Sequence, residues 1–116
     1  MADADPSCLF CKIAAGEIPA DRVFEDDDVI VFRDINPRAP THVLVIPRRH
    51  VPSAAELTDA DGDLLAALFA ALRRVAEGGG LHSYRIVTNV GPDSGQSVLH
   101  LHFHLLGGRS MSWPPG

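Results

Sequence analysis

The chain has 116 residues, among them six histidines and two cysteines, and a formal net charge of -5. Its basic residues are scattered rather than gathered into a stripe, which argues against nucleic-acid binding, and it contains no run of about 18 apolar residues that could cross a membrane. One domain, residues 1–116, accounts for this length, and the acidic start at 1–6 lacks a signal-peptide pattern, so we expect a cytoplasmic protein.

The first half of the chain is predicted to hold a short helix and three strands. Residues 1–7 are expected to form a flexible lead-in, and the apolar spacing over 8–15 predicts a short helix that Gly16 ends. Apolar runs separated by polar or proline-containing turns predict the strands. These strands are expected at Arg22–Glu25, Val29–Arg33 and 43–47.

The second half is dominated by one long amphipathic helix. Thr58 is a suitable N-cap, an apolar stripe follows it, and the glycines at 78–80 end the helix. Further strands are predicted at 84–88 and 99–106, ahead of a C-terminal tail at 107–116. The whole pattern predicts an α+β domain, in which a meander of about five antiparallel strands carries one long helix and one short N-terminal helix.

The segment 100–106 alternates histidine with apolar side chains. In a strand, residues two apart point to the same face, so His100, His102 and His104 would share one face while the apolar residues pack on the other. Same-face neighbours lie about 6.6–6.8 Å apart, which places His100 about 13 Å from His104. Because one metal ion needs its ligand nitrogens about 2 Å away, the three histidines cannot all bind one ion and must have different roles.

A glycine-containing loop at 89–97 precedes this histidine row. Gly91 and Gly95 permit backbone conformations in which successive amides can point at one anion, and Asn89 and Ser97 add neutral donors. An ordinary hairpin turn would have the same composition. The position of the loop just before the histidines favours phosphate binding, which would place a nucleophile beside a phosphate.

The two cysteines, Cys8 and Cys11, form a single C-x-x-C motif. In a reducing compartment such a motif binds a metal, acts as a redox pair, or consists of two inert thiols. Two thiolates are only half of a tetrahedral zinc site, so a structural zinc would need two further ligands.

Motifs along nearly the whole chain resemble those of the histidine triad (HIT) family. The most specific is the His-x-His-x-His-x-x signature at 100–106, in which x is apolar. The ending at 113–116 resembles the HINT branch, the purine nucleoside phosphoramidases, and the N-terminal C-x-x-C resembles its bacterial members. The resemblance implies the HIT fold. Further matching segments lie at 10–13, 17–20, 32–35, 39–42, 95–97 and 107–108.

The resemblance also implies a covalent mechanism. The family's nucleophile falls on His102, whose imidazole would attack the α-phosphorus, expel an amine and form a nucleotidyl-histidine that water hydrolyses. His42 would support the triad by hydrogen bonding, and Ser97 would contact the leaving-group side, although the sequence alone does not identify the proton donor. The family's phosphate contacts fall on His104, Ser97, Asn89 and the backbone of Gly95 and Gln96.

The nucleoside contacts implied by the resemblance are Asp34, for the ribose hydroxyls, and an apolar slot for the base. From the residues alone, Asp34 could equally cap a turn and the apolar side chains could be core. Leu99 and Asn36 depart from the family pattern, where an aromatic residue and a serine are frequent, and this leaves the fine substrate preference open. The slot would consist of Leu9, Phe10, Ile13, Phe32 and Ile35.

A structural zinc and a homodimer are further implications of the resemblance, which implies no catalytic cofactor. Bacterial members that resemble this chain often use a Cys2His2 set to pin the N-terminal helix to the sheet, and here that set would be Cys8, Cys11, His50 and His100. In HINT-like dimers a tryptophan near the C-terminus contributes to the partner subunit's active site, and Trp113 matches that tryptophan. The implied ligand is a purine nucleotide such as AMP or GMP.

Three functions are therefore compared. The first is the phosphoramidase, and the second is a dinucleotide-polyphosphate hydrolase or nucleotidylyl transferase of a sister branch, which Ser97 and Trp113 disfavour. The third is a non-catalytic nucleotide- or metal-binding module, which the intact His102 disfavours because a binding module needs no nucleophile.

Overall fold

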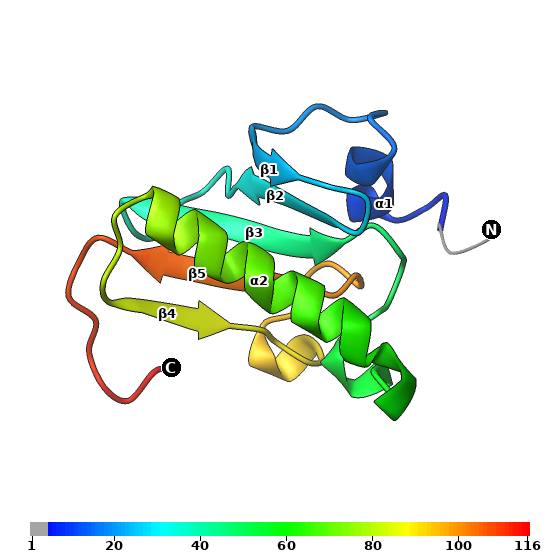
Figure 1. Cartoon of the computed structure of the whole chain (residues 1–116). Coiled ribbons are helices and arrows are strands. Elements are labelled where there is room, and N and C mark those ends of the chain that lie inside the picture. The colour runs from blue at the N-terminus through cyan, green and yellow to red at the C-terminus, as the bar shows by residue number, and fades with distance from the viewer. Residues whose placement is uncertain (1–4) are drawn as a thin grey trace.

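The computed structural model describes residues 5–116 and shows an antiparallel sheet with a long helix lying across one face (Figure 1). The first four residues of the predicted lead-in lie outside the described residues. No helix in the described part of the chain combines the length and the apolar character that a membrane span requires. The strands are β1 (Arg22–Glu25), β2 (Val29–Arg33), β3 (Thr41–Pro47), β4 (Tyr84–Val87) and β5 (Phe103–Gly107), and the α-helices are α1 (Leu9–Ala14) and α2 (Gly62–Gly78).

The sheet departs from the predicted meander at one place. Its strand order is β1-β2-β3-β5-β4, with every neighbouring pair antiparallel. After β3 the chain crosses the sheet through α2 and forms β4 at the edge of the sheet. The last strand, β5, then lies between β3 and β4. As a result β5, which carries His104, is paired on both sides and is held more firmly than an edge strand would be.

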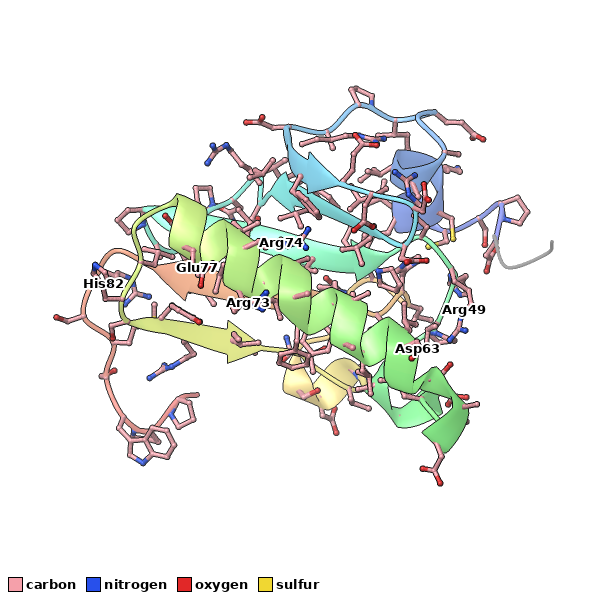
Figure 2. The ribbon with its side chains drawn as sticks, in the orientation of Figure 1. Arg49, Asp63, Arg73, Arg74, Glu77 and His82 are labelled. Atoms are coloured by element: carbon pink, nitrogen blue, oxygen red, sulfur yellow. The ribbon has the colours of Figure 1, made fainter. Side chains whose placement is uncertain are left out.

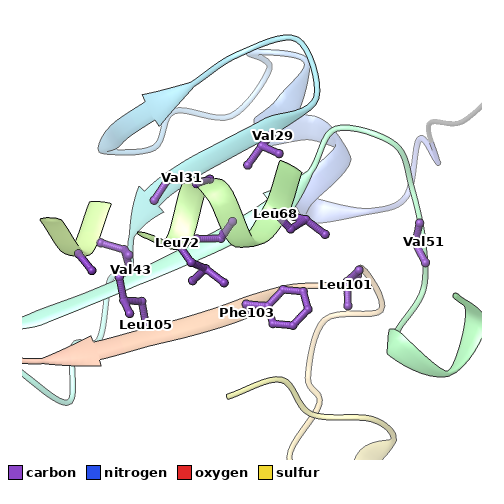
Figure 3. Close-up of a cluster of buried hydrophobic side chains, with 12 residues drawn as sticks. Val29, Val31, Val43, Val51, Leu68, Leu72, Leu101, Phe103 and Leu105 are labelled. Atoms are coloured by element: carbon purple, nitrogen blue, oxygen red, sulfur yellow. The ribbon is translucent and has the colours of Figure 1, made fainter. Parts of the chain in front are cut away.

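The two faces of the sheet are both buried where β2 and β3 lie. Alternate residues of these strands, such as Val31 and Val43, face α2 and pack with Leu68 and Leu72 (Figure 3). The intervening residues, such as Phe32, face the opposite side and pack against α1. This two-sided burial explains why β2 and β3 are continuous apolar runs rather than alternating ones.

The long helix begins three residues later than the Thr58 cap predicts. Thr58 does form a capping box with Asp61, but the turn that it caps is a 3-10 helix over Asp59–Asp61, and α2 starts at Gly62. A salt bridge of 2.6 Å from Arg49 to Asp61 anchors this turn. Within residues 5–116, two other single 3-10 turns lie at Ala54–Glu56 and Pro92–Ser94. The charged side chains of α2 are exposed on the outer side of the helix, away from the core (Figure 2), at Asp63, Arg73, Arg74 and Glu77.

The histidine segment forms a shorter strand than the alternation predicts. β5 starts at Phe103 instead of position 99, because the backbone just before it bonds to other partners. The amide of Leu101 donates to Val51 O at 2.6 Å, and the Thr88 hydroxyl donates to His102 O at 2.7 Å. The alternation of faces nevertheless persists through the irregular part, since Leu101, like Phe103, belongs to the core beneath α2.

Candidate functional site

A cavity of about 270 Å³ lies at the junction of α1, the end of β2 and the histidine segment. Two histidines, one carboxylate and one serine are among the side chains that line it. A larger hollow of about 410 Å³ lies between α2 and the first strands, but no histidine, cysteine or carboxylate among residues 5–116 lines that hollow. The smaller cavity is lined by Leu9, Phe10, Ile13, Phe32, Arg33, Asp34, Ile35, Leu44, Ser97, Val98, His102 and His104.

The apolar wall of the cavity comes mainly from α1. Cys8 caps this helix by accepting from the Cys11 amide, and the helix presents Leu9 and Phe10 to the cavity. The Phe10 ring meets the Phe32 ring edge-on, with centroids 5.5 Å apart. Phe10 and Phe32 are buried while Leu9 is 44% exposed, so the wall belongs to the core and to the cavity at once. The core interpretation is correct for Phe10 and Phe32, and the base-binding slot stays a prediction for side chains that do line a cavity.

The polar wall of the cavity includes Asp34 and His104, and His42 lies directly behind them. Nε2 of His42, on β3, lies 2.9 Å from Nδ1 of His104, on β5, and 3.4 Å from Oδ2 of Asp34. The two strands are paired, which brings these residues together across the sheet. Asp34 also accepts from the Asn36 amide at 2.8 Å, so it does cap a turn as well as line the cavity.

The hydrogen bonds assign a tautomer to each histidine of this site. The Arg38 amide donates to Nδ1 of His42 at 3.0 Å, so the proton of neutral His42 sits on Nε2 and is donated to Nδ1 of His104. His104 must then carry its own proton on Nε2. The carbonyl of His100 accepts from Nδ1 of His102 at 2.7 Å, which leaves Nε2 of His102 with a free lone pair. His102 thus offers a nucleophilic nitrogen, and His104 offers a hydrogen-bond donor.

Burial keeps the supporting histidines neutral. It lowers the pKa of His104 to about 4, and repulsion from the charged forms of His102 and His42 adds to this effect. Burial also lowers the pKa of His42, against the opposing attraction of the Asp34 carboxylate. At neutral pH both side chains are therefore in the neutral form that the tautomer assignment requires.

The loop before the histidine segment is closed on itself. Gly91 and Gly95 have φ values of +85° and +103°, and these conformations tighten the loop. The Gly95 amide donates to Pro92 O and the Gln96 amide to Gly91 O, each at 3.1 Å, so these two amides do not form the predicted anion cradle. The Gln96 side chain also points inward, donating to Pro52 O at 2.7 Å.

Two cysteines and two histidines form a second cluster next to this cavity. Sγ of Cys8 lies 3.3 Å from Nδ1 of His100, and Sγ of Cys11 lies 3.3 Å from Nδ1 of His50. The Nδ1 atoms of the two histidines are 3.3 Å apart, and all four ligand atoms lie within 4.8 Å of one another. A tetrahedral zinc with bonds of about 2.0–2.3 Å sets its ligand atoms about 3.3–3.8 Å apart. The cluster therefore fits a zinc ion.

The groups around this cluster are those that a metal site requires. Nε2 of His100 donates to Pro47 O at 2.9 Å, which fixes its ring and leaves Nδ1 free for a metal. The Asp5 amide donates to Sγ of Cys11 at 3.4 Å, and the Asp5 carboxylate faces Nε2 of His50 at 4.0 Å. This part of the predicted flexible lead-in is thus placed by contacts with the cluster. Burial lowers the pKa of His100 to about 4, which favours the neutral, ligating form.

Comparison with known proteins identifies the family. The HIT domain model matches residues 15–111. The chain belongs to the HIT family. It is 50% identical over 109 residues to a HIT-like protein of Synechococcus elongatus, covering 93% of this chain and 96% of the relative. It is 46% identical over 115 residues to a 14 kDa zinc-binding protein of Zea mays, covering 97% and 90%. A HIT family hydrolase from Legionella pneumophila superposes with a TM-score of 0.93 at 52% identity, covering 95% of this chain and 100% of that one.

Most residues that the sequence predicts for the nucleotide site line the cavity of this HIT domain, with His42 directly behind it. Asn89, Gly95 and Gln96 do not line it in the described chain, although the Asn89 amide lies beside Gly95. Trp113 is 81% exposed and is also outside the set lining the cavity within residues 5–116. Sequence reasoning missed three lining residues, of which Leu44 is the partner of Phe32 across β2 and β3. They are Arg33, Leu44 and Val98.

The lowered pKa of His104 predicts a pH-dependent contribution to stability. Folding favours its neutral form, so the contribution is complete above the ordinary pKa of 6.5 and is lost as the pH falls toward about 4. We expect His104→Gln to flatten the dependence of the unfolding free energy on pH between these values, measured by urea denaturation. The cluster of Cys8, Cys11, His50 and His100 is unchanged in the variant, so the difference from the wild type reports on His104. Parallel curves for the two proteins would contradict the assignment.

Proposed function

We propose that this protein hydrolyses the P–N bond of purine nucleoside 5′-phosphoramidates through a covalent nucleotidyl-histidine on His102. The observation that carries the proposal is the tautomer pair in the cavity, in which His102 offers a lone pair at Nε2 and His104 offers a proton at Nε2. The description of the similar Legionella protein as a hydrolase supports the reaction class.

The reaction divides into two displacements at phosphorus. In the first, Nε2 of His102 attacks the α-phosphorus, the P–N bond breaks, and the amine leaves with the bonding electrons and takes up a proton. In the second, water attacks the same phosphorus and gives up a proton to solvent, the P–N bond to His102 breaks with its electron pair returning to Nε2, and a nucleoside monophosphate is released. Throughout, the proton on Nδ1 of His102 stays hydrogen-bonded to the His100 carbonyl, which stabilises the positive charge that develops on the ring.

Phosphate contacts come from the residues nearest the nucleophile. The proton on Nε2 of His104 donates to a phosphate oxygen, while His42 keeps that tautomer in place. The Ser97 hydroxyl lines the same cavity and serves the leaving-group side. Asn89 joins these contacts from the adjacent loop, and the amides of Gly95 and Gln96 would contribute only after the loop opens.

Recognition of the nucleoside follows from the rest of the cavity. Asp34 has acceptor sites left after its bond to Asn36, and these suit the 2′- and 3′-hydroxyls of a ribose. The apolar wall suits a flat purine, with the fully exposed Ile35 at the mouth available to cover the base. A deoxyribose would leave one acceptor of Asp34 without its donor, so we expect ribonucleotides to be preferred.

Replacing the nucleophile tests the proposal. His102→Ala should abolish turnover of adenosine 5′-phosphoramidate, because it removes the Nε2 lone pair that attacks phosphorus, while AMP binding measured by calorimetry persists. Diadenosine polyphosphate serves as the competing substrate. Faster cleavage of the dinucleotide by the wild type would move the protein to the sister branch, and turnover of neither compound would favour a nucleotide-binding module.

The Cys2His2 cluster supports a structural zinc in each chain. All four ligands come from the protein, which closes the coordination sphere and leaves the metal no catalytic position. The similarity to a zinc-binding protein of Zea mays supports the choice of metal. Reduced thiols are needed for this role, which accords with the cytoplasmic location expected from the sequence.

Metal analysis checks the zinc assignment. We expect about one zinc per chain by elemental analysis, and a large loss of bound zinc in Cys11→Ser because one thiolate is removed. His82→Gln is the control, since His82 is an exposed histidine outside the cluster and should leave the zinc content unchanged. Zinc far below one per chain in freshly purified protein, or full retention by Cys11→Ser, would refute the assignment.

An exposed apolar patch on α2 and β4 supports a homodimer. Phe69, Tyr84 and Ile86 are 47%, 41% and 36% exposed and line one shallow hollow. β4 pairs with β5 on one side, and within residues 5–116 no strand pairs with its other side. A second copy would cover this patch, and its C-terminal tail would bring the exposed Trp113 to the neighbouring nucleotide cavity.

The dimer is tested at the free edge of β4. The wild type should sediment with the mass of two chains, and Ile86→Lys should shift it toward one, because a buried charge in the interface is costly. Val23→Lys is the matched control: Val23 is 40% exposed on β1, the opposite edge strand, and its replacement should not change the mass. Monomeric wild type, or dimeric Ile86→Lys, would refute this interface.

A further inference from the structure

The metal cluster and the nucleotide cavity share the short helix α1. Cys8 and Cys11, two of the four cluster residues, flank Leu9 and Phe10, which line the cavity. A helix of six residues has little stability of its own. The position of this cavity wall therefore depends on what holds α1, and the cluster is a direct attachment of α1 to residues from two other parts of the fold.

The two sites also share His100. Its Nδ1 faces the cluster, its Nε2 donates to Pro47 O at 2.9 Å, and its carbonyl accepts from Nδ1 of His102 at 2.7 Å. The position of this carbonyl determines how the His102 ring is oriented and which nitrogen keeps the lone pair. A metal bound to His100 would therefore hold the group that orients the nucleophile.

Phe10 closes the connection between the two sites. Its ring packs edge-on against His100 and against His102, with centroid separations of 5.9 and 5.1 Å, while it also lines the cavity. A displacement of α1 would change the support of both rings together. Direct side-chain contacts through Phe10 thus connect the cluster to the cavity.

We propose that zinc occupancy of the Cys2His2 cluster and nucleotide occupancy of the cavity are thermodynamically linked, each increasing the affinity for the other. The first ligand to bind orders α1 and the His100 carbonyl, so the second no longer has to supply that ordering free energy. His100 is accordingly a positioning residue for His102. The linkage rests on the proposed function in taking a purine nucleotide as the ligand of the cavity and zinc as the metal of the cluster.

Reciprocity makes the proposal quantitative. If zinc raises the affinity for AMP by some factor, AMP must raise the affinity for zinc by the same factor, and couplings of this kind commonly range from about 5-fold to 150-fold. With one short helix and one carbonyl to order, we expect a factor of about tenfold. Two independent titrations therefore have to agree.

The experiment measures the linkage from both sides on the full chain. AMP dissociation constants are determined by calorimetry for the zinc-loaded and the zinc-stripped protein, with circular dichroism to confirm that both are folded. Zinc release to a chelating indicator is followed with and without saturating AMP. The second measurement starts from the zinc-loaded protein, so it remains decisive if stripping unfolds the chain. We expect tighter AMP binding with zinc, and slower and less complete zinc release with AMP.

Variants separate the metal from the helix that carries its ligands. Cys8→Ser removes a thiolate but keeps an N-cap residue on α1, so it should bind AMP like the stripped wild type. Asp5→Asn is a milder change, because Asp5 contacts the cluster and does not line the nucleotide cavity in the described chain. This variant should have a lower affinity for zinc and should bind AMP normally at saturating zinc. Lys12→Gln, on the same helix but outside both sites, is the control.

A spectroscopic signature distinguishes positioning from general stability. The Nδ1 proton of His102 should give a hydrogen-bonded imidazole resonance in the zinc-loaded protein and broaden by solvent exchange when zinc is removed, in samples with the same circular dichroism. Equal AMP affinities with and without zinc, together with AMP-independent zinc release, would overturn the linkage and leave the phosphoramidase proposal standing. Absence of AMP binding to the zinc-loaded protein would overturn both.

Discussion

The hydrogen bond from Nδ1 of His102 to the carbonyl of His100, 2.7 Å long, is the constraint on which the account of the site depends. Because a carbonyl can only accept, it forces the His102 proton onto Nδ1 and the lone pair onto Nε2. The opposite arrangement holds at His42, where the Arg38 amide donates to Nδ1. His42 therefore donates from Nε2 to Nδ1 of His104, which leaves the His104 proton on Nε2. Backbone groups thus set the chemistry of three side chains.

The fold supplies the rigidity that such an arrangement needs. β5 lies between β3 and β4, so the backbone carrying His104 is bonded on both sides, and β3 places His42 diagonally across from it, opposite Leu106. The apolar residues that alternate with the histidines, including Leu101 and Leu105, are fully buried beneath α2. A side chain on one face of the strand therefore cannot move without disturbing the core on the other.

Local patterns in the sequence were sufficient for the parts of the fold that depend on neighbouring residues. β1 and β2 have the predicted bounds, and the spacing of two along 100–106 correctly separates the histidines from the core. Contacts between distant segments were not predictable. The bond from Leu101 to Val51 shortens β5, and the crossover through α2 sets the strand order. The lining residue Leu44 enters the cavity through cross-strand pairing, which the sequence does not display.

The stereochemical course at phosphorus tests the central claim most directly. A phosphorothioate analogue of adenosine 5′-phosphoramidate, chiral at phosphorus, is hydrolysed in isotopically labelled water and the configuration of the product is determined. Attack by His102 followed by attack of water comprises two in-line displacements, each with inversion, so the account predicts net retention. Net inversion would show that water attacks the substrate directly, and it would contradict a nucleotidyl-histidine intermediate whatever the effect of replacing His102.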